Sequence, residues 1–187
     1  MMSKLTNKYL LLATLILGGA EANIVHANES YLTEGTQEVG VQGSVDFDYA
    51  DKYQVLLNTN YGYFLSHGWE VGGDVDINAT KSYKSAAVGV FTEYNFVNQT
   101  DWTPYVGIGT QLLTANYNDA ENHTSTESFD ATAMNLKLSA GMKYFVNEHV
   151  ALTAEVNHNI ATDDLHMSGG DPKRSLTKFL IGTKFYF

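Results

Sequence analysis

Hydrophobic and polar residues alternate one by one through most of this chain, and residues 69–79 show the pattern most clearly. The odd-numbered positions there are Trp, Val, Gly, Val, Ile and Ala, whereas the even-numbered positions include Glu70, Asp74 and Asp76. A strand places alternate side chains on opposite faces, but a helix with its 3.6-residue period would scatter these carboxylates around every side. The pattern therefore predicts a β-strand with one apolar and one polar face.

The same alternation recurs along the chain, interrupted by polar turns. The expected strands are residues 39–49, 53–63, 69–79, 86–96, 102–112, 132–146, 150–160 and 179–187. Short turns near Ser66, Gln99 and Asn147 alternate with connections of variable length near Asp51, Ser82, Glu121 and Gly170. Bacterial membrane barrels have short periplasmic turns and longer external loops. We therefore expect an all-β fold, an eight-stranded antiparallel up-and-down transmembrane β-barrel with both termini in the periplasm.

Aromatic residues gather at the ends of the expected strands. Tyr61, Tyr63, Trp69, Tyr94, Phe96, Trp102, Tyr144, Phe185 and Phe187 fall at periplasmic ends, and Tyr49, Tyr53, Tyr117 and Phe129 fall at outer ends. Membrane barrels carry such girdles at both lipid interfaces. This clustering favours a membrane barrel over a soluble β-sandwich, in which aromatic residues are also common.

The beginning of the chain predicts an export signal. Lys4 and Lys8 precede an apolar run at residues 9–17, which small residues follow, as in a secretory signal peptide. The run is well short of the roughly 20 apolar residues that a transmembrane helix needs. We expect residues 1–27 to be cleaved off, with a cut after residue 22 as the alternative, and residues 28–187 to form the barrel domain.

Composition narrows the possibilities further. The chain has no cysteine, so an exported form is no disulfide scaffold and must be stabilised by packing or by a closed hydrogen-bonded sheet. Its formal net charge of −10 argues against nucleic acid as a partner.

The polar faces of the expected strands carry most of the charge. They place inside the barrel the acids Asp46, Asp48, Glu70, Asp74, Asp76, Glu93 and Glu155 and the bases Lys137, Lys143, Lys178 and Lys184. An eight-stranded barrel is only wide enough inside for side chains, and a buried charge without a partner is costly. We therefore expect a network of ion pairs that fills the lumen. The alternative is a narrow, porin-like channel that prefers cations.

The histidines give little indication of catalysis. No two of the six share a face at a metal-ligand spacing, and neither a metal nor another cofactor is expected. His166-Met-Ser168 imitates the His-x-Ser pair of outer-membrane lipid A deacylases, but no carboxylate follows Asp171 to orient the imidazole. A lipid A modifying hydrolase is therefore the second alternative, and no catalytic residue is assigned.

Several stretches resemble the small eight-stranded outer-membrane barrel families, which include the OmpA transmembrane domain, OmpX-like proteins and opacity-type surface antigens. They are residues 103–109 (TPYVGIG), 138–145 (LSAGMKYF) leading into 150–155 (VALTAE), and 182–187 (GTKFYF). The last resembles the signal that these families present to the barrel-assembly machinery, with Gly182, Phe185 and Phe187 at its main positions. Leu180 departs from that signal, where a polar residue is usual.

The resemblance covers the mature chain, and it implies fold and assembly much more strongly than function. Because the chain ends at the barrel, we do not expect the peptidoglycan-binding domain that follows the barrel in full-length OmpA.

We expect an integral outer-membrane protein of a Gram-negative bacterium, non-enzymatic, with a structural or adhesion-like surface role. The expected partners are outer-membrane lipid, the barrel-assembly machinery and an extracellular ligand of the polar loops at residues 118–130 and 161–175. Phosphates of lipopolysaccharide would meet Lys52, Lys81, Lys84, Lys173 and Arg174 on the outer side. The rival fold is a soluble lipocalin-like barrel, which would need an apolar interior.

Overall fold

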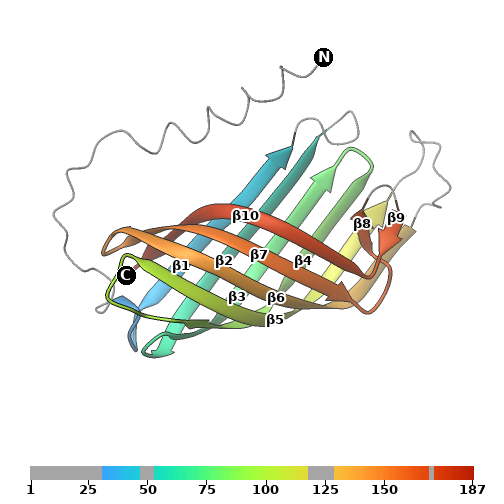
Figure 1. The fold of residues 1–187 in the computed structure, drawn as a ribbon. Coiled ribbons are helices and arrows are strands. Elements are labelled where there is room, and N and C mark those ends of the chain that lie inside the picture. The colour runs from blue at the N-terminus through green and yellow to red at the C-terminus, as the bar shows by residue number, and fades with distance from the viewer. Residues whose placement is uncertain (1–30, 47–52, 118–128, 169–170) are drawn as a thin grey trace, which may run out of the picture.

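The protein is a closed antiparallel barrel with sequential strands (Figure 1). The computed structural model describes residues 31–46, 53–117, 129–168 and 171–187, without the side chains of residues 45, 46, 129 and 168. The barrel strands are β1 Gln37–Asp46, β2 Gln54–Ser66, β3 Trp69–Thr80, β4 Tyr83–Asn95, β5 Trp102–Tyr117, β6 Phe129–Asn147, β7 Val150–Ala161 and β10 Ser175–Tyr186. Each pairs with its neighbour in sequence, and β1 closes on β10. The expected eight-stranded fold is confirmed.

The two faces of the barrel have opposite chemistry. Apolar side chains such as Val88, Leu112 and Phe179 are exposed on the outside, while the buried side chains inside include many acids, amides and lysines. This is the reverse of a soluble core, because lipid solvates the outer face and polar groups fill the lumen. The charged interior contradicts the lipocalin-like alternative.

β5 and β6 continue beyond their expected ends, and the reason is a change of polarity within the strand. Up to Leu112 the apolar positions face outward, whereas Leu113, Ala115 and Tyr117 face inward and are buried. The backbone pairing continues from Leu112↔Met134 to Tyr117↔Phe129. A reading that follows the outward apolar face stops where that face becomes polar, although the strand does not end there.

All of the aromatic residues expected at the periplasmic ends are exposed on the outer face. At the outer end Tyr53 is exposed, but Tyr117 is 3% exposed and points into the lumen, so its assignment to a girdle was wrong. Tyr49 lies outside the described residues, and the side chain of Phe129 is not described.

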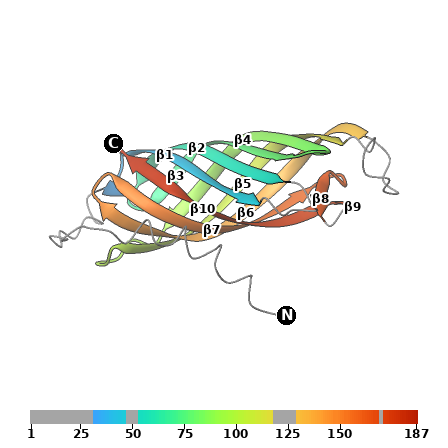
Figure 2. The same cartoon turned by 90° about the horizontal axis from the view of Figure 1, so that it is seen from above.

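The second long loop contains structure that the sequence did not predict. Short strands β8 (His166–Ser168) and β9 (Asp171–Lys173) pair with each other. They lie at the end of the barrel opposite the C-terminus (Figures 1 and 2). Leu165, His166 and Met167 are buried there, so this loop is only partly a solvated polar segment. Among the described residues, none belongs to a helix long and apolar enough to cross a membrane. The expected signal segment lies outside the described residues.

Candidate functional site in the barrel lumen

The most deeply buried charges lie near the periplasmic end, where five strands each contribute one side chain. This periplasmic charge cluster consists of Glu38, Glu70, Glu93, Lys143 and Lys184. The Lys143 Nζ lies 2.6 Å from a Glu93 oxygen, 2.9 Å from a Glu38 oxygen and 3.7 Å from a Glu70 oxygen. The Lys184 Nζ lies 2.6 Å from Glu38 and 3.3 Å from Glu93. The two ammonium groups hold together carboxylates from β1, β3 and β4.

The cluster has one more acid than base. Glu70 and Glu93 are direct cross-strand partners. Two carboxylates placed opposite each other repel one another unless cations lie nearby. Neither oxygen of Glu70 accepts a hydrogen bond within the described part of the chain. A Cβ on Gly62 would come within 1.6 Å of a Glu70 oxygen, so the absence of a side chain at residue 62 makes room for this carboxylate.

The carboxylates of the cluster also have the spacing of a metal site. One oxygen from each of Glu38, Glu70 and Glu93 lies within 4.8 Å of the others. However, the ammonium of Lys143 is already within 3.7 Å of all three side chains. The lysines therefore occupy the position that a cation would take, and the arrangement fits an internal ion-pair cluster better than a metal centre.

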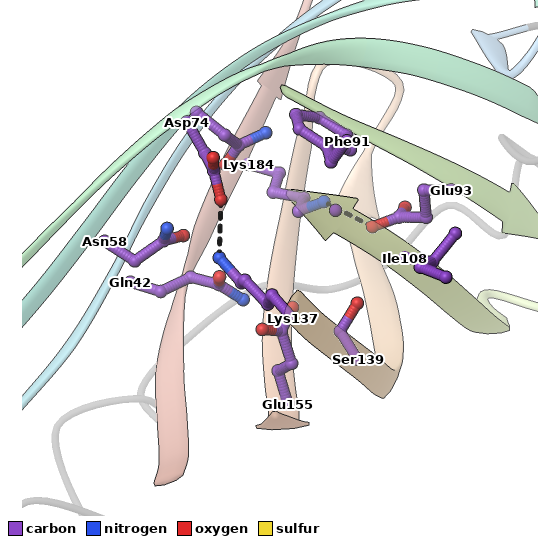
Figure 3. Close-up of a pocket in the computed structure, with 12 residues that line it drawn as sticks. Gln42, Asn58, Asp74, Phe91, Glu93, Ile108, Lys137, Ser139, Glu155 and Lys184 are labelled. Atoms are coloured by element: carbon purple, nitrogen blue, oxygen red, sulfur yellow. Dashed lines mark hydrogen bonds and ion pairs between the residues drawn. The ribbon is translucent and has the colours of Figure 1, made fainter. Parts of the chain in front are cut away.

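A second set of charges lies nearer the middle of the barrel. Lys137 donates hydrogen bonds to Asp74 at 2.7 Å and to Asp76 at 3.3 Å, and the Gln111 amide donates to Asp74 at 3.0 Å. Figure 3 shows Lys137 pointing at Asp74 across the lumen, with Glu155 beside it. Glu155 itself accepts a hydrogen bond from the Tyr105 hydroxyl at 2.8 Å.

Lys178 differs from the other three lysines that the sequence places in the lumen. It lines the outer part of the lumen beside Asp76 and His166. Yet it forms no ion pair within 4 Å among the described residues, unlike Lys137, Lys143 and Lys184. Asp48 lies outside the described residues, and the side chain of Asp46 is not described.

The sequence reading missed two residues of the network. Glu38 was left out because the first strand was taken to begin at residue 39, yet it contacts both lysines of the cluster. Tyr105 was treated as part of the start of a strand, but the ring centroid lies 5.1 Å from the Lys143 Nζ and 5.0 Å from the Lys184 Nζ. Its odd number gives it the same face as Gly107 and Gly109 in β5, and this parity could have identified it.

Apolar plugs close both ends of the lumen. The periplasmic plug consists of Leu32, Phe64, Phe145, Ala151 and Tyr186. The outer plug is formed by Leu165 and Met167 from the loop, packed against Tyr83, Leu113, Tyr117 and small side chains of the wall. The Tyr83 hydroxyl also donates a hydrogen bond of 2.7 Å to the Leu165 carbonyl.

Two small cavities lie between the described residues of the lumen. The larger of the two holds about 30 Å³ and is lined by polar side chains such as Gln42 and Asp74, together with Phe91 and Ile108 (Figure 3). The smaller one, beneath β8, holds about 10 Å³. A water molecule requires roughly 10–15 Å³ measured in this way. Each of these two cavities therefore has room for isolated waters only.

His166 lies inside the outer mouth, away from the lipid face. Its Nε2 is 3.2 Å from the Asn135 Oδ1, and no carboxylate of the described residues hydrogen-bonds the ring. Burial, reinforced by nearby Lys178, lowers the pKa of His166 to about 4. The side chain of Ser168 is not described. Within the described part, the ring is therefore oriented by an amide and not by the carboxylate that a triad requires.

The residues of the expected assembly signal lie along β10 and at its end. Phe185 and Phe187 are exposed on the outer face. Gly182 lies at the seam with β1, where a Cβ would come within 2.2 Å of the Val41 carbonyl oxygen. Leu180 is 1% exposed and faces the lumen, beside Glu155, its cross-strand partner on β7.

A family model described as "Outer membrane protein beta-barrel domain" matches residues 10–187. The chain belongs to this family. The family and the membrane-type exterior place the protein in the outer membrane, as the sequence predicted. No curated protein matches the chain in sequence.

Solved structures of outer-membrane barrels share the fold. The N-terminal β-barrel domain of Pseudomonas aeruginosa OprF has a TM-score of 0.61 at 17% identity, with 82% of this chain and 98% of that chain covered. Neisserial surface protein A (NspA) has a TM-score of 0.56 at 15% identity, with 81% of this chain and 95% of that chain covered. Ail, the attachment invasion locus protein of Yersinia pestis, has a TM-score of 0.51 at 15% identity, with 83% of this chain and 100% of that chain covered. At such identities the likeness shows the fold of this family member and leaves its specific role open.

Proposed function

We propose that this outer-membrane barrel is a closed, non-conducting structural protein that presents its external loops at the cell surface. The observation that carries the proposal is the closure of the lumen at successive levels. The outer plug, the central ion pairs, the periplasmic charge cluster and the periplasmic plug follow one another along the axis. A conducted ion would have to displace buried, ion-paired side chains, which is costly.

Conductance in planar lipid bilayers tests this closure. The protein purified from outer membranes, and shown to be folded by its resistance to room-temperature detergent on gels, is expected to give no steps above the lipid background at either polarity. Steady, cation-selective steps from the same folded fraction would favour the narrow channel instead. A barrel with both Leu165 and Met167 changed to serine is the matched comparison, because it lacks the outer plug and keeps the inner network.

Lipopolysaccharide is the partner that the exposed lysines at the outer end support best. Lys84 lies on the outward face at the outer end of β4 and is exposed, and Lys173 on β9 is exposed as well. Arg174 is a weaker candidate because it already pairs with Asp164 at 3.4 Å. Lys52 lies outside the described residues. The barrel is expected to be more stable in bilayers that contain lipopolysaccharide than in phospholipid alone, and changing Lys84 and Lys173 to glutamine should remove this difference. If the variant kept the full difference in stability, the proposed contact would be contradicted.

The proposal includes the absence of lipid A hydrolysis. The His166 ring faces Asn135 inside the mouth, whereas an acyl chain of lipid A would lie outside the barrel. Mass spectra of lipid A are expected to be identical in cells producing the native protein, the His166→Gln variant or the Ser168→Ala variant. Loss of an acyl chain that depends on either residue would sink this part of the proposal.

An adhesion-like role remains a proposal for the loops, and the loop at residues 118–128 lies outside the described residues. Ail, the attachment invasion locus protein of Yersinia pestis, supports this role only through a shared fold. Cells producing the native barrel and cells with residues 118–128 replaced by a glycine-serine linker would be compared for binding to cultured epithelial cells. Equal binding would argue for a purely structural role.

A further inference from the structure

The two plugs of the lumen differ in how they are attached to the barrel. The periplasmic plug takes most of its side chains, including Phe64, Phe145 and Tyr186, from the barrel strands. The outer plug depends on Leu165 and Met167, which belong to the loop between β7 and β10. This segment could leave the mouth without breaking the pairing of any barrel strand.

One buried polar ring lies between the two apolar side chains of that loop. His166 is 3% exposed, and among the described residues its ring hydrogen-bonds only the Asn135 side chain. The cavity of about 10 Å³ beside it is too small to hydrate an imidazolium. A charge placed there would lose its hydration and would hydrogen-bond no carboxylate of the described residues, which is costly.

We propose that β8 and the adjoining Leu165 form a lid over the outer mouth, which opens in acid when His166 gains a proton. The charges that face this ring come from several elements. Lys178 of β10 lines the same cavity and opposes a positive ring, as does His158 of β7. Lys173, the cross-strand neighbour on β9, is exposed to solvent. Asp76 of β3 favours a positive ring. The effects of burial and of the cations on the ring outweigh that of Asp76. Protonation of His166 therefore destabilises the closed position of the lid.

The sign of the pH effect follows from linkage. When the lid is closed the pKa of His166 is about 4, below its ordinary value of 6.5, which an exposed ring would regain with the lid open. The closed state is therefore fully favoured above pH 6.5 and weakens as the pH falls toward 4. Since each pKa unit is a factor of ten, the closed-to-open ratio should fall by about two orders of magnitude over that window. The lid would respond in this way whether or not the barrel conducts.

The methionines of the chain provide a native probe of the lid. Within the described part, Met167 is buried in the outer plug, whereas Met134 and Met142 are exposed on the lipid face. Protein with ¹³C-methyl methionine, purified from outer membranes into detergent micelles, would be studied by NMR with a water-soluble gadolinium chelate. At pH 7.5 the Met167 signal should be protected, and at pH 3.5 it should broaden severalfold while the other two do not change.

Two variants decide whether His166 causes the opening. His166→Gln stays neutral and can still donate to Asn135, so its Met167 signal should remain protected at both pH values. His67→Gln changes an exposed histidine of a periplasmic turn and should behave like the native protein. The proposal is overturned if Met167 is accessible at pH 7.5, if it stays protected at pH 3.5 in the native protein, or if His166→Gln opens in acid as well.

Discussion

The two halves of the lumen use polar groups in different ways. In the periplasmic half, Lys143 and Lys184 bind the carboxylates of three separate strands without exposure to solvent. In the outer half, neutral amides dominate: Asn135 donates to Gln111 at 2.7 Å and to Asn159 at 3.0 Å. Charges link strands that are distant in sequence, whereas the amides form a chain between neighbouring strands.

This difference indicates where the barrel is rigid and where it can open. Removing Lys143 or Lys184 leaves uncompensated carboxylates, so the periplasmic half should not tolerate the loss of either lysine. Removing one neutral amide costs about one hydrogen bond. The outer half, whose plug comes from a loop, should therefore tolerate substitution and local opening.

The largest effect is expected from Lys143→Met. This change leaves Glu38, Glu70 and Glu93 with Lys184 alone, and breaking such a buried network should lower the free energy of unfolding by roughly 3–5 kcal/mol. Urea titration in detergent, followed by the mobility of folded and unfolded bands on gels, measures the loss. Lys84→Met, at an exposed position on the outer face, is the control. Equal stability of the two variants would show that the cluster does not hold the barrel together.

A pair of charge-neutralising variants separates geometry from net charge in the same cluster. Glu38 accepts hydrogen bonds from Lys143 at 2.9 Å and from Asn60 at 2.9 Å, so Glu38→Gln should destabilise the barrel by about 1.5–3 kcal/mol. Glu70→Gln removes the excess acid, whose oxygens accept no hydrogen bond within the described part of the chain, and should be neutral or stabilising. Both variants lose one negative charge. A similar loss of stability in both would mean that Glu70 is as well satisfied as Glu38.

The seam where the barrel closes gives an intermediate effect. Gly182→Ala places a methyl group against the backbone of β1, and overpacking of this kind typically costs 1–3 kcal/mol. Gly73→Ala is the matched control, because a Cβ there meets its nearest atom only at 3.4 Å. Slower appearance of the folded band for Gly182→Ala alone would support a steric role for this glycine. An assembly defect in cells without any defect in detergent refolding would instead favour its role in the assembly signal.

Alternation was sufficient to predict the eight barrel strands and their order, because a period of two directly separates lipid from lumen. It also gave the inward face of the described lumen charges other than Glu38. It failed where the outward face turns polar, beyond Leu112. Alternation could not predict which lumen side chains pair with each other, because contact between Lys143 and Glu38 depends on the tilt and stagger of the closed sheet. The lid was missed for another reason: Leu165 and Met167 are isolated apolar residues in a polar loop, and no periodic pattern reveals where they pack.

The smallest effect, and the sharpest test of the two halves, comes from two single hydroxyl groups. Tyr83→Phe removes the donor to the Leu165 carbonyl and should cost about 1 kcal/mol of lid closure while leaving global unfolding nearly unchanged. Tyr105→Phe removes the donor to Glu155 and should show the opposite: a lower urea midpoint with the Met167 methyl group still protected. The two measurements are independent, because one reports the barrel and the other reports the lid. If Tyr83→Phe lowered the urea midpoint as much as Tyr105→Phe, the loop would be an integral part of the barrel and not a separable cover.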